Sequence, residues 1–269
     1  MYVMGDIHGQ IDKMRAVLIE AELIDPEDRW VGGAATLWFM GDYFDRGPDG
    51  IAAIDLIRSL QEQAEAAGGH VGALIGNHDV LILAAQRFGD RPSGGPGGTF
   101  LSSWRNNGGE ESDLAQLTSE RVAWLCALQA MALDGGRLLA HADATFYQAY
   151  GRSAAAVNDH FRAILRSNDA RAWDQLLDYF SQRRAFQDRD LGPARAGRFL
   201  SLYGGRQLVH GHTPIAKLLG CPPEDVTQAL IYAGGLAIDV DAGMYQGGPG
   251  FVTYLPESGE YDLATELHG

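Results

Sequence analysis

Aspartates, histidines and an asparagine recur directly after short apolar runs that end in glycine or alanine. The chain has "GDIHGQ" at 5–10, "GDYFDRG" at 41–47 and "GNHD" at 76–79, followed later by "AHAD" at 140–143 and "HGHTP" at 210–214. A glycine lets the backbone turn sharply at the carboxyl end of a strand, and α/β sheets place their sites along that edge. We therefore expect these carboxylate, imidazole and amide side chains to meet at one rim of a sheet.

Ligands of this kind suit a site for two divalent metal ions. Asp6 and His8 are two residues apart, so on an extended segment their side chains point the same way. Oxygen and imidazole ligands without a thiolate favour manganese, iron or zinc, and magnesium less well. Two such ions roughly 3.5–4 Å apart share a bridging carboxylate and activate a water for in-line attack on phosphorus.

The first third of the chain alternates apolar strand patterns with helical ones. Strands are predicted within 1–5, 34–41 and 70–77, with helices at about 10–23 and 49–66 between them. This alternation is typical of right-handed parallel crossovers and of an α/β fold.

The remainder reads as helices followed by further strands. A helix at about 79–88 precedes a glycine- and proline-rich loop over 89–110, and a second helix is expected at about 119–128. "MALDGGRLLAHA" at 131–142 predicts a hairpin around Asp-Gly-Gly. Helical patterns over 144–204 precede strands predicted within 206–211, 228–234, 236–243 and 250–255. We expect a single domain over 1–269, with a helical insertion at about 144–200.

Composition and charge restrict the class of partner. The formal net charge of −14 disfavours a nucleic-acid-binding face, which needs clustered lysines and arginines. No apolar run approaches the length of a membrane span, and no basic amino-terminal leader is visible. Cys126 and Cys221 read as ordinary thiols. These features predict a cytoplasmic protein without membrane or nucleic-acid partners. They leave the oligomeric state open.

Taken in order, the five motifs resemble those of the calcineurin-like metallophosphoesterase superfamily. The resemblance is to its PPP-type serine/threonine phosphatases, with the bacterial and phage members closest in style, and it extends over residues 5–214. It implies a four-layer α/β fold, in which a central β-sandwich is flanked by helices.

The resemblance also implies a role for each motif residue. Asp42 would bridge two metal ions, of which manganese is the first expectation and iron, zinc or magnesium the alternatives. The other ligands it implies are Asp6 and His8 for the first ion, and Asn77, His141 and His212 for the second.

Three further residues would act on the substrate. Arg46 would grip the phosphoryl oxygens with two parallel hydrogen bonds, beside Asn77. His78 would protonate the leaving oxygen, and Asp45 would hold its ring in the productive orientation. A second phosphate-binding arginine is typical of the family, and "SQRRAFQDRD" offers Arg183 or Arg184 before Arg189.

Nearby polar and aromatic residues have plainer interpretations. Asp79 is expected to be a favourable charge in the first turn of a helix. His210 is expected to be structural, because the family pattern selects His212 as the ligand. Asp143 is left open as a residue that orients a ligand. The residues expected to have structural or packing roles are Asp241, His70, His160, Trp104 and Trp173.

Details of the motifs favour one branch of the superfamily. Nucleases and cyclic-nucleotide diesterases usually end in "GHxH", whereas this chain has "GHTP". Asp45 and "GHTP" favour a serine/threonine protein phosphatase, acting on a phosphoprotein or a small phosphate ester. Asp79 favours the alternative, a symmetrical diadenosine-tetraphosphate hydrolase, because these share "GNHD" in place of "GNHE". A non-catalytic binding module is disfavoured, since no ligand or catalytic pair is lost.

Overall fold

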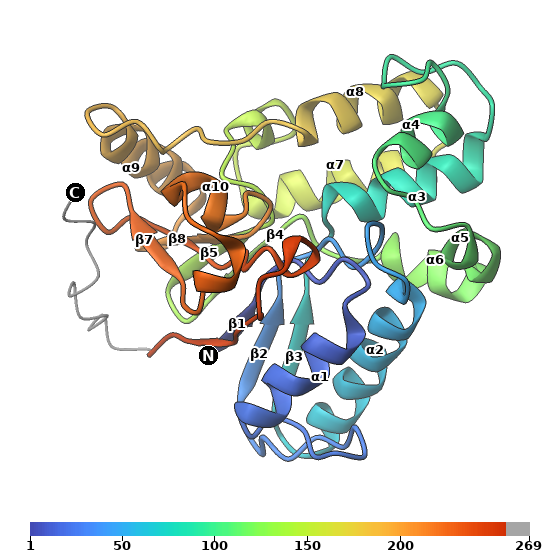
Figure 1. The fold of residues 1–269 in the computed structure, drawn as a ribbon. Helices are drawn as coiled ribbons and strands as arrows, with labels where there is room; N and C mark the ends of the chain where they lie inside the picture. Colours follow the sequence, from blue (N-terminus) through green and yellow to red (C-terminus); the bar gives the residue numbers. More distant parts are fainter. Residues whose placement is uncertain (257–269) are drawn as a thin grey trace.

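The first sheet consists of three parallel strands and one short antiparallel strand, in the order β3-β2-β1-β9. A computed structural model describes residues 1–256 and shows this sheet beneath the helices of the upper half (Figure 1). Its strands are β1 (Tyr2–Met4), β2 (Thr36–Phe39), β3 (His70–Ala73) and β9 (Thr253–Tyr254). The crossovers are α1 (Ile11–Glu20) and α2 (Gly50–Ala66), so the predicted parallel units are confirmed.

The second sheet has the order β4-β5-β6-β8-β7 and is parallel at its centre and antiparallel at both edges. Its strands are β4 (Met131–Asp134), β5 (Arg137–Ala140), β6 (Leu208–His210), β7 (Leu230–Tyr232) and β8 (Ala237–Asp239). The predicted hairpin is confirmed: Gly135 and Gly136 join β4 to β5, and both adopt a positive φ. Glycine takes this conformation without steric cost.

Alternation along the strands shows that the two sheets pack face to face. Val3 and Trp38 belong to a buried cluster that also contains Leu139, Val209 and Ile238 of the second sheet. The alternate residues of β1 and β2 pack instead with α1 and α2. The indole Nε1 of Trp38 also donates to Asp134 Oδ2 across the sandwich, at 2.6 Å.

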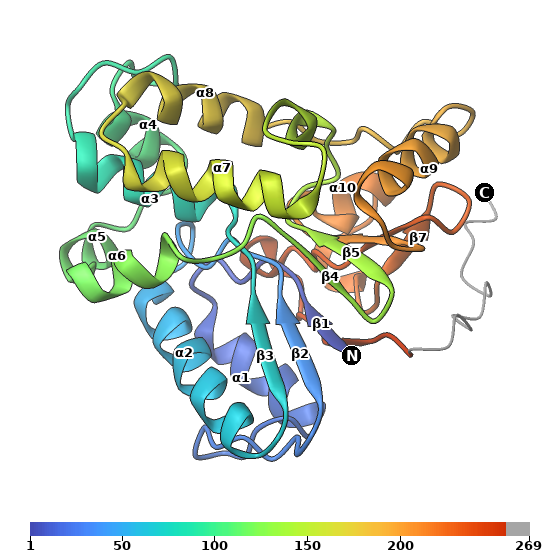
Figure 2. The ribbon, with the colours of Figure 1, turned by 180° about the vertical axis from the view of Figure 1, so that it is seen from behind.

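Helices cover the outer faces of this sandwich and complete the four layers. The helices α1 and α2 lie on the first sheet, while α7 (Ala154–Arg166) and α9 (Gly192–Tyr203) lie toward the second (Figure 2). Within residues 1–256 the other α-helices are α3 (Asn77–Phe88), α4 (Phe100–Asn106), α5 (Glu111–Gln116), α6 (Ser119–Leu125), α8 (Ala170–Phe180) and α10 (Ile215–Leu219). The same part of the chain contains three short 3-10 helices, Phe146–Ala149, Pro223–Asp225 and Met244–Gln246. Within residues 1–256, no helix is long and apolar enough to cross a membrane.

The prediction of a loop over 89–110 is wrong in its second half, where α4 (Phe100–Asn106) forms. Thr99 Oγ1 accepts the N–H of Ser102, and the Ser102 hydroxyl oxygen accepts the N–H of Thr99, which makes a reciprocal cap. Phe100 and Trp104, four residues apart on one helix face, are fully buried. The prolines and glycines before Thr99 obscured this short helix in the sequence.

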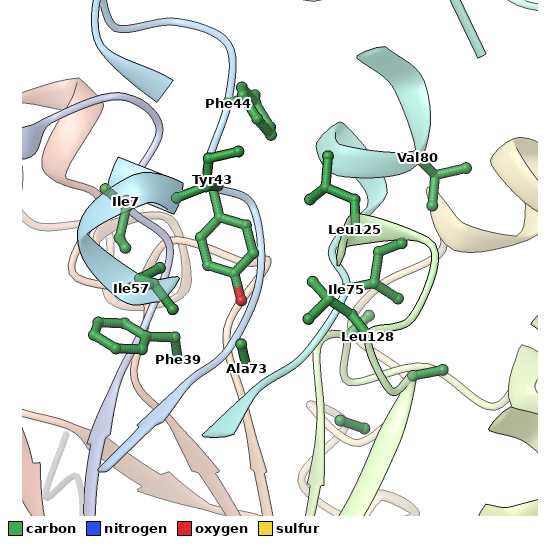
Figure 3. Packing of buried hydrophobic residues seen from close by; sticks show 14 of the residues in the cluster. Ile7, Phe39, Tyr43, Phe44, Ile57, Ala73, Ile75, Val80, Leu125 and Leu128 are labelled. Atoms are coloured by element: carbon green, nitrogen blue, oxygen red, sulfur yellow. The ribbon is translucent and has the colours of Figure 1, made fainter. Parts of the chain in front are cut away.

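The loop after β2 is anchored in the core through Tyr43. Its ring is fully buried, and Figure 3 shows it reaching down from the loop toward Ala73 of β3. The phenol donates to the carbonyl of Leu74 at 2.7 Å. The motif "GDYFDRG" therefore rests on the hydrophobic core directly below it.

Gly72 should be required by the sandwich, because Trp38 pairs with it across β2 and β3. A Cβ at Gly72 would lie 2.4 Å from the Trp38 ring, so Gly72→Ala should lower the free energy of unfolding by about 1–3 kcal/mol. The matched control is Gly197→Ala in α9, where the nearest atom to a Cβ lies 3.9 Å away. That change should stabilise by about 0.5–1 kcal/mol. Urea denaturation measures both, and equal shifts would contradict this account.

Candidate dinuclear metal centre

The loops that follow β1 and β2 are joined through the main chain of Asp42. The N–H groups of Ile7 and His8 both donate to the Asp42 carbonyl, at 3.1 and 2.9 Å. The N–H of Gly9 donates to the Tyr43 carbonyl at 2.8 Å. These bonds fix the backbone of "GDIHGQ" against that of "GDYFDRG".

The third loop is joined to the second through the side chain of Asp79, which is fully buried. Its carboxylate accepts the N–H groups of Gly76, Asp42 and Tyr43, at 2.7, 3.0 and 2.9 Å. Asp79 does lie in the first turn of α3, as predicted. The prediction of a helix charge alone is nevertheless incomplete, because Asp79 also fastens the β2 loop to the β3 loop.

Two groups of candidate ligands share Asp42. One contains His8, Asp42 and His78, the other Asp42, His141 and His212, and within each group the ligand atoms lie within 4.8 Å of one another. Burial raises the pKa of Asp42, but the imidazoles of His141 and His78 outweigh burial and hold this pKa well below its usual value. Asp42 is therefore an anion between two sets of imidazoles, as a bridging ligand must be.

The tautomers of two histidines direct their free nitrogens into this cluster. His8 Nδ1 lies 2.7 Å from the Phe44 carbonyl, and His141 Nδ1 lies 2.8 Å from that of Met40. A carbonyl only accepts, so each Nδ1 carries the proton and each Nε2 faces the cluster. His8 Nε2 is 3.6 Å from Asp42 Oδ2 and 4.0 Å from Asp6 Oδ2.

The surroundings of His141 Nε2 fit a cation. This atom faces Asn77 Oδ1 at 3.1 Å and Asp42 Oδ1 at 3.4 Å. Burial lowers the pKa of His141, yet Asp42 overcomes this and raises it above the usual value. A positive charge, carried by a proton or a metal ion, is favoured between these atoms.

The side chain of His212 fits the role of a metal ligand. Among residues 1–256, its buried Nε2 finds no hydrogen-bond partner. Burial, with His141 nearby, lowers the pKa of His212 well below the usual value, so this nitrogen offers a lone pair. The His212 N–H donates to both oxygens of Asp6, at 2.9 and 3.1 Å. A side chain at Gly211 would put its Cβ 2.2 Å from Asp6 Oδ1, so only glycine fits there.

The backbone conformation also singles out the predicted site. Of nine non-glycine residues with a positive φ in the described part of the chain, six are predicted site residues. They are His8, Asp42, Asp45, Arg46, Arg184 and His212. Such conformations cluster where a fold over-determines its functional side chains.

Arg46 lies beside the cluster and is partly buried. Its guanidinium donates to His8 Nε2 at 3.1 Å and to His78 Nε2 at 2.8 Å, and it stacks 4.4 Å above the Tyr245 ring. Its own N–H donates to the Gly108 carbonyl at 2.7 Å. Arg46 is thus held where an anion beside the ligands would meet two parallel N–H donors.

His78 and Asp45 form a buried pair beside Arg46. His78 Nδ1 lies 2.7 Å from Asp45 Oδ2, and the indole Nε1 of Trp104 donates to Asp45 Oδ1 at 2.7 Å. Burial raises the pKa of Asp45, and the bond from Trp104 opposes that rise. Trp104 is fully buried, as expected of a packing residue, but the bond to Asp45 was not foreseen.

The two candidate arginines of "SQRR" differ in their contacts. Arg183 Nη1 donates to the His212 carbonyl at 3.4 Å, which brings its guanidinium to the ligand cluster. Arg184 adopts a left-handed conformation, and both side chains are exposed. Arg183 is therefore the better placed of the two.

His210 lies outside both ligand groups. Its Nδ1 is 2.9 Å from the Gly211 carbonyl, and its Nε2 is 2.8 Å from the Tyr232 hydroxyl. That hydroxyl is also 3.1 Å from Asp143 Oδ2, while Thr213 donates to Asp143 Oδ1 at 3.3 Å. His210 and Asp143 therefore share a buried polar network behind the ligands. The ring of His141 is oriented by the Met40 carbonyl, not by Asp143.

Comparison with known proteins identifies the family. Residues 1–216 match the family model of the calcineurin-like phosphoesterases, and the chain belongs to that family. The family uses divalent metals, in agreement with the two groups of ligands built around Asp42.

Individual relatives match over shorter stretches. Shewanella-like protein phosphatase 2 of Arabidopsis thaliana is 36% identical over 83 residues, which are 31% of this chain and 21% of the relative. A symmetrical bis(5'-nucleosyl)-tetraphosphatase of Pectobacterium atrosepticum is 34% identical over 83 residues, 31% of this chain and 25% of the relative. The matched segments thus cover about a fifth to a quarter of these curated relatives. A cold-active protein tyrosine phosphatase shares the fold, with a TM-score of 0.70 at 22% identity over 93% of this chain and 72% of that one.

Asp79→Asn should destabilise the protein, because an amide group cannot accept all three backbone N–H bonds. We expect a loss of about 1–3 kcal/mol in the free energy of unfolding, the usual cost of a buried unsatisfied group. Urea denaturation of metal-free protein isolates this effect. The control is Asp12→Asn, at an exposed aspartate in the first turn of α1, which should change stability by less than about 0.5 kcal/mol. Similar changes in the free energy of unfolding for both variants would show that Asp79 acts only as a charge in the first turn of its helix.

His212→Ala should lower the metal content by one ion per chain, because His212 Nε2 is a candidate ligand atom that has no hydrogen-bond partner among residues 1–256. His210→Ala is the matched control, since the nitrogens of His210 already have protein partners. Metal content after reconstitution and dialysis, measured by atomic emission, should be lower for the first variant only. A loss at His210→Ala with full retention at His212→Ala would reverse the assignment.

Proposed function

We propose that this protein is a dinuclear metal phosphoesterase that hydrolyses phosphomonoesters, with phosphoserine and phosphothreonine in proteins as its substrates. The observation that carries the proposal is the pair of candidate ligand groups sharing Asp42, with the Arg46 guanidinium bonded to His8 and His78 beside them. The buried His78–Asp45 pair lies next to this guanidinium. These contacts support a site in which metal ligands, a phosphate-binding arginine and a proton carrier would act together.

The metal ligands we assign are Asp6, His8 and Asp42 for one ion, and Asp42, Asn77, His141 and His212 for the other. His78 belongs to the first group, but it differs from His8 in that its Nδ1 is held by a carboxylate, that of Asp45, so we assign it to proton transfer. Manganese is the ion we expect for this mixture of imidazole and oxygen ligands. When bound, the two ions would activate the attacking water and offset the charge of the phosphoryl oxygens.

Arg46 and Arg183 would hold the phosphoryl group together with the Asn77 amide, and Arg184 is the second candidate for the Arg183 role. A guanidinium binds phosphoryl oxygens through two parallel hydrogen bonds. Arg46 would therefore give up its hydrogen bonds to His8 and His78 and form bonds to the substrate instead. Arg183 would approach from the His212 side. Substrate binding thus frees His78 Nε2 from the guanidinium.

His78 would then supply the proton for the leaving group. As the water oxygen bonds to phosphorus, the ester P–O bond breaks and its electron pair stays on the ester oxygen. His78 Nε2 protonates that oxygen, giving the alcohol and inorganic phosphate. Burial, joined by the nearby Arg46, lowers the pKa of His78 to about 3. An anionic substrate that draws Arg46 away favours the protonated ring, while Asp45 holds Nδ1–H.

A pocket beside Asn77 supports a protein substrate over a dinucleotide. Its volume is about 770 Å³, and its walls come from α3, α4, α8 and residues 93–96. Its charged lining residues are Asp174, Asp178 and Arg171, so carboxylates outnumber cations. A chain of additional phosphates would be repelled there, whereas neutral or basic side chains flanking a phosphoserine would not.

A symmetrical diadenosine-tetraphosphate hydrolase remains the second candidate. It is favoured by Asp79 in "GNHD" and by relatives that carry this name, such as that of Pectobacterium atrosepticum. The acidic lining of the pocket is the observation for which we prefer the protein phosphatase to this hydrolase.

A substrate panel on manganese-reconstituted protein tests the proposal. It contains an aryl phosphate, phosphoserine, phosphothreonine and phosphotyrosine peptides, and diadenosine tetraphosphate. We expect the highest kcat/KM for the phosphoserine and phosphothreonine peptides, and loss of all activity after chelation. A preference for the dinucleotide would establish the alternative. Failure to hydrolyse any ester with both ions bound would overturn the proposed function.

A further inference from the structure

Trp104 of α4 contacts the His78–Asp45 pair through a hydrogen bond to Asp45. The indole Nε1 of Trp104 is hydrogen-bonded to one oxygen of Asp45 and His78 Nδ1 to the other, both at 2.7 Å. Trp104 and Asp45 are fully buried, and His78 is 2% exposed. The three side chains form a single line of hydrogen bonds shielded from water, in which competition from solvent is removed.

The donor chemistry of the indole restricts how the Asp45 carboxylate is oriented. An indole N–H only donates, so Asp45 Oδ1 must accept and cannot turn toward another donor. Rotating the carboxylate about its Cβ–Cγ bond would break the bonds to Trp104 and to His78 together. The orientation of the Asp45 carboxylate, and through it that of the His78 ring, is therefore set by Trp104.

The segment that carries Trp104 is itself tied to the β2–α2 loop. The Gly108 carbonyl accepts the N–H of Arg46, and Asp113 of α5 accepts those of Gly50 and Ile51 at 3.0 and 3.1 Å. A Cβ at Gly109 would lie 2.3 Å from the indole, so the backbone closes directly over the ring. The indole thus has a fixed position relative to Asp45.

We propose that Trp104 is a positioning residue for leaving-group protonation, holding Asp45 so that His78 Nε2 points at the ester oxygen. It acts through Asp45 and does not touch the substrate. This inference rests on the proposed function, and it adds a residue from α4 to the site.

Trp104→Phe keeps most of the ring bulk and removes the N–H donor, so its effect should depend on the leaving group. General acid catalysis contributes about 10²–10⁴-fold, and it matters most for a poorly leaving alkoxide. We expect kcat on a phosphoserine peptide to fall by about 10-fold or more, and kcat on a nitrophenyl phosphate by less than about 3-fold. Metal content should remain that of the wild type.

Two comparisons separate positioning from a general structural defect. Trp38→Phe removes another indole–carboxylate bond, that to Asp134, and should leave the ratio of the two rates unchanged. In a His78→Asn background, Trp104→Phe should cause no further loss on the peptide, because residues acting as one unit are not additive. If Trp104→Phe fails to fold, the benzothiophene analogue of tryptophan at position 104 retains the shape and replaces N–H by sulfur. It should give the same dependence on leaving group.

Equal losses on both esters, or an additional loss in the His78→Asn background, would overturn the role of Trp104. The same holds for a variant whose rates match the wild type. In each of these outcomes the wild type still hydrolyses both esters, so the proposed function stands. A metal-loaded wild type that hydrolyses neither ester overturns both proposals.

Discussion

Three backbone N–H groups converge on the buried carboxylate of Asp79, and the placement of the ligands depends on that convergence. Gly76 and Asp42 bond to one oxygen and Tyr43 to the other, so the ends of two parallel strands are joined at a single side chain. A second bond joins the same two loops in the opposite direction: the Asp42 carboxylate accepts the N–H of His78 at 2.8 Å. The proposed bridging ligand, Asp42, and the proposed proton carrier, His78, are thus positioned by the same exchange of bonds.

These hydrogen bonds between loops explain how the site maintains strained backbone conformations. Left-handed conformations at non-glycine residues cost of order 1–3 kcal/mol each, and His8, Asp42, Asp45, Arg46 and His212 all adopt them. A hydrogen bond in the folded protein contributes about 0.5–1.5 kcal/mol, so several of them together are comparable. The bonds that Asp79, Asp42 and Asp6 accept from the main chain therefore offset the strain that turns the side chains inward. The core beneath, through Tyr43, resists relaxation of the loop.

Sequence reasoning reached the features that are local and missed those that span the chain. Each motif directly follows a strand, so its position at the sheet edge could be inferred, and the parallel direction of β1, β2 and β3 followed from the intervening helices. The second sheet facing the first came from the family resemblance, because strand alternation does not say what a buried face packs against. The Trp104–Asp45 bond joins residues 59 apart, and the Asp79–Asp42 bond joins residues 37 apart. Neither leaves a local pattern in the sequence.

Charge connects metal binding to folding in this site. Burial raises the pKa of Asp6 well above its usual value, and the neighbouring carboxylates of Asp241 and Asp42 raise it further. The folded chain therefore concentrates acidic groups that repel one another in a region shielded from water. Cations bound there would relieve that repulsion, and they bind the folded state in preference to the unfolded one. By linkage, each tenfold excess of free metal over its dissociation constant adds about 1.4 kcal/mol to stability. The arrangement that creates the site is therefore also the one that the ions stabilise.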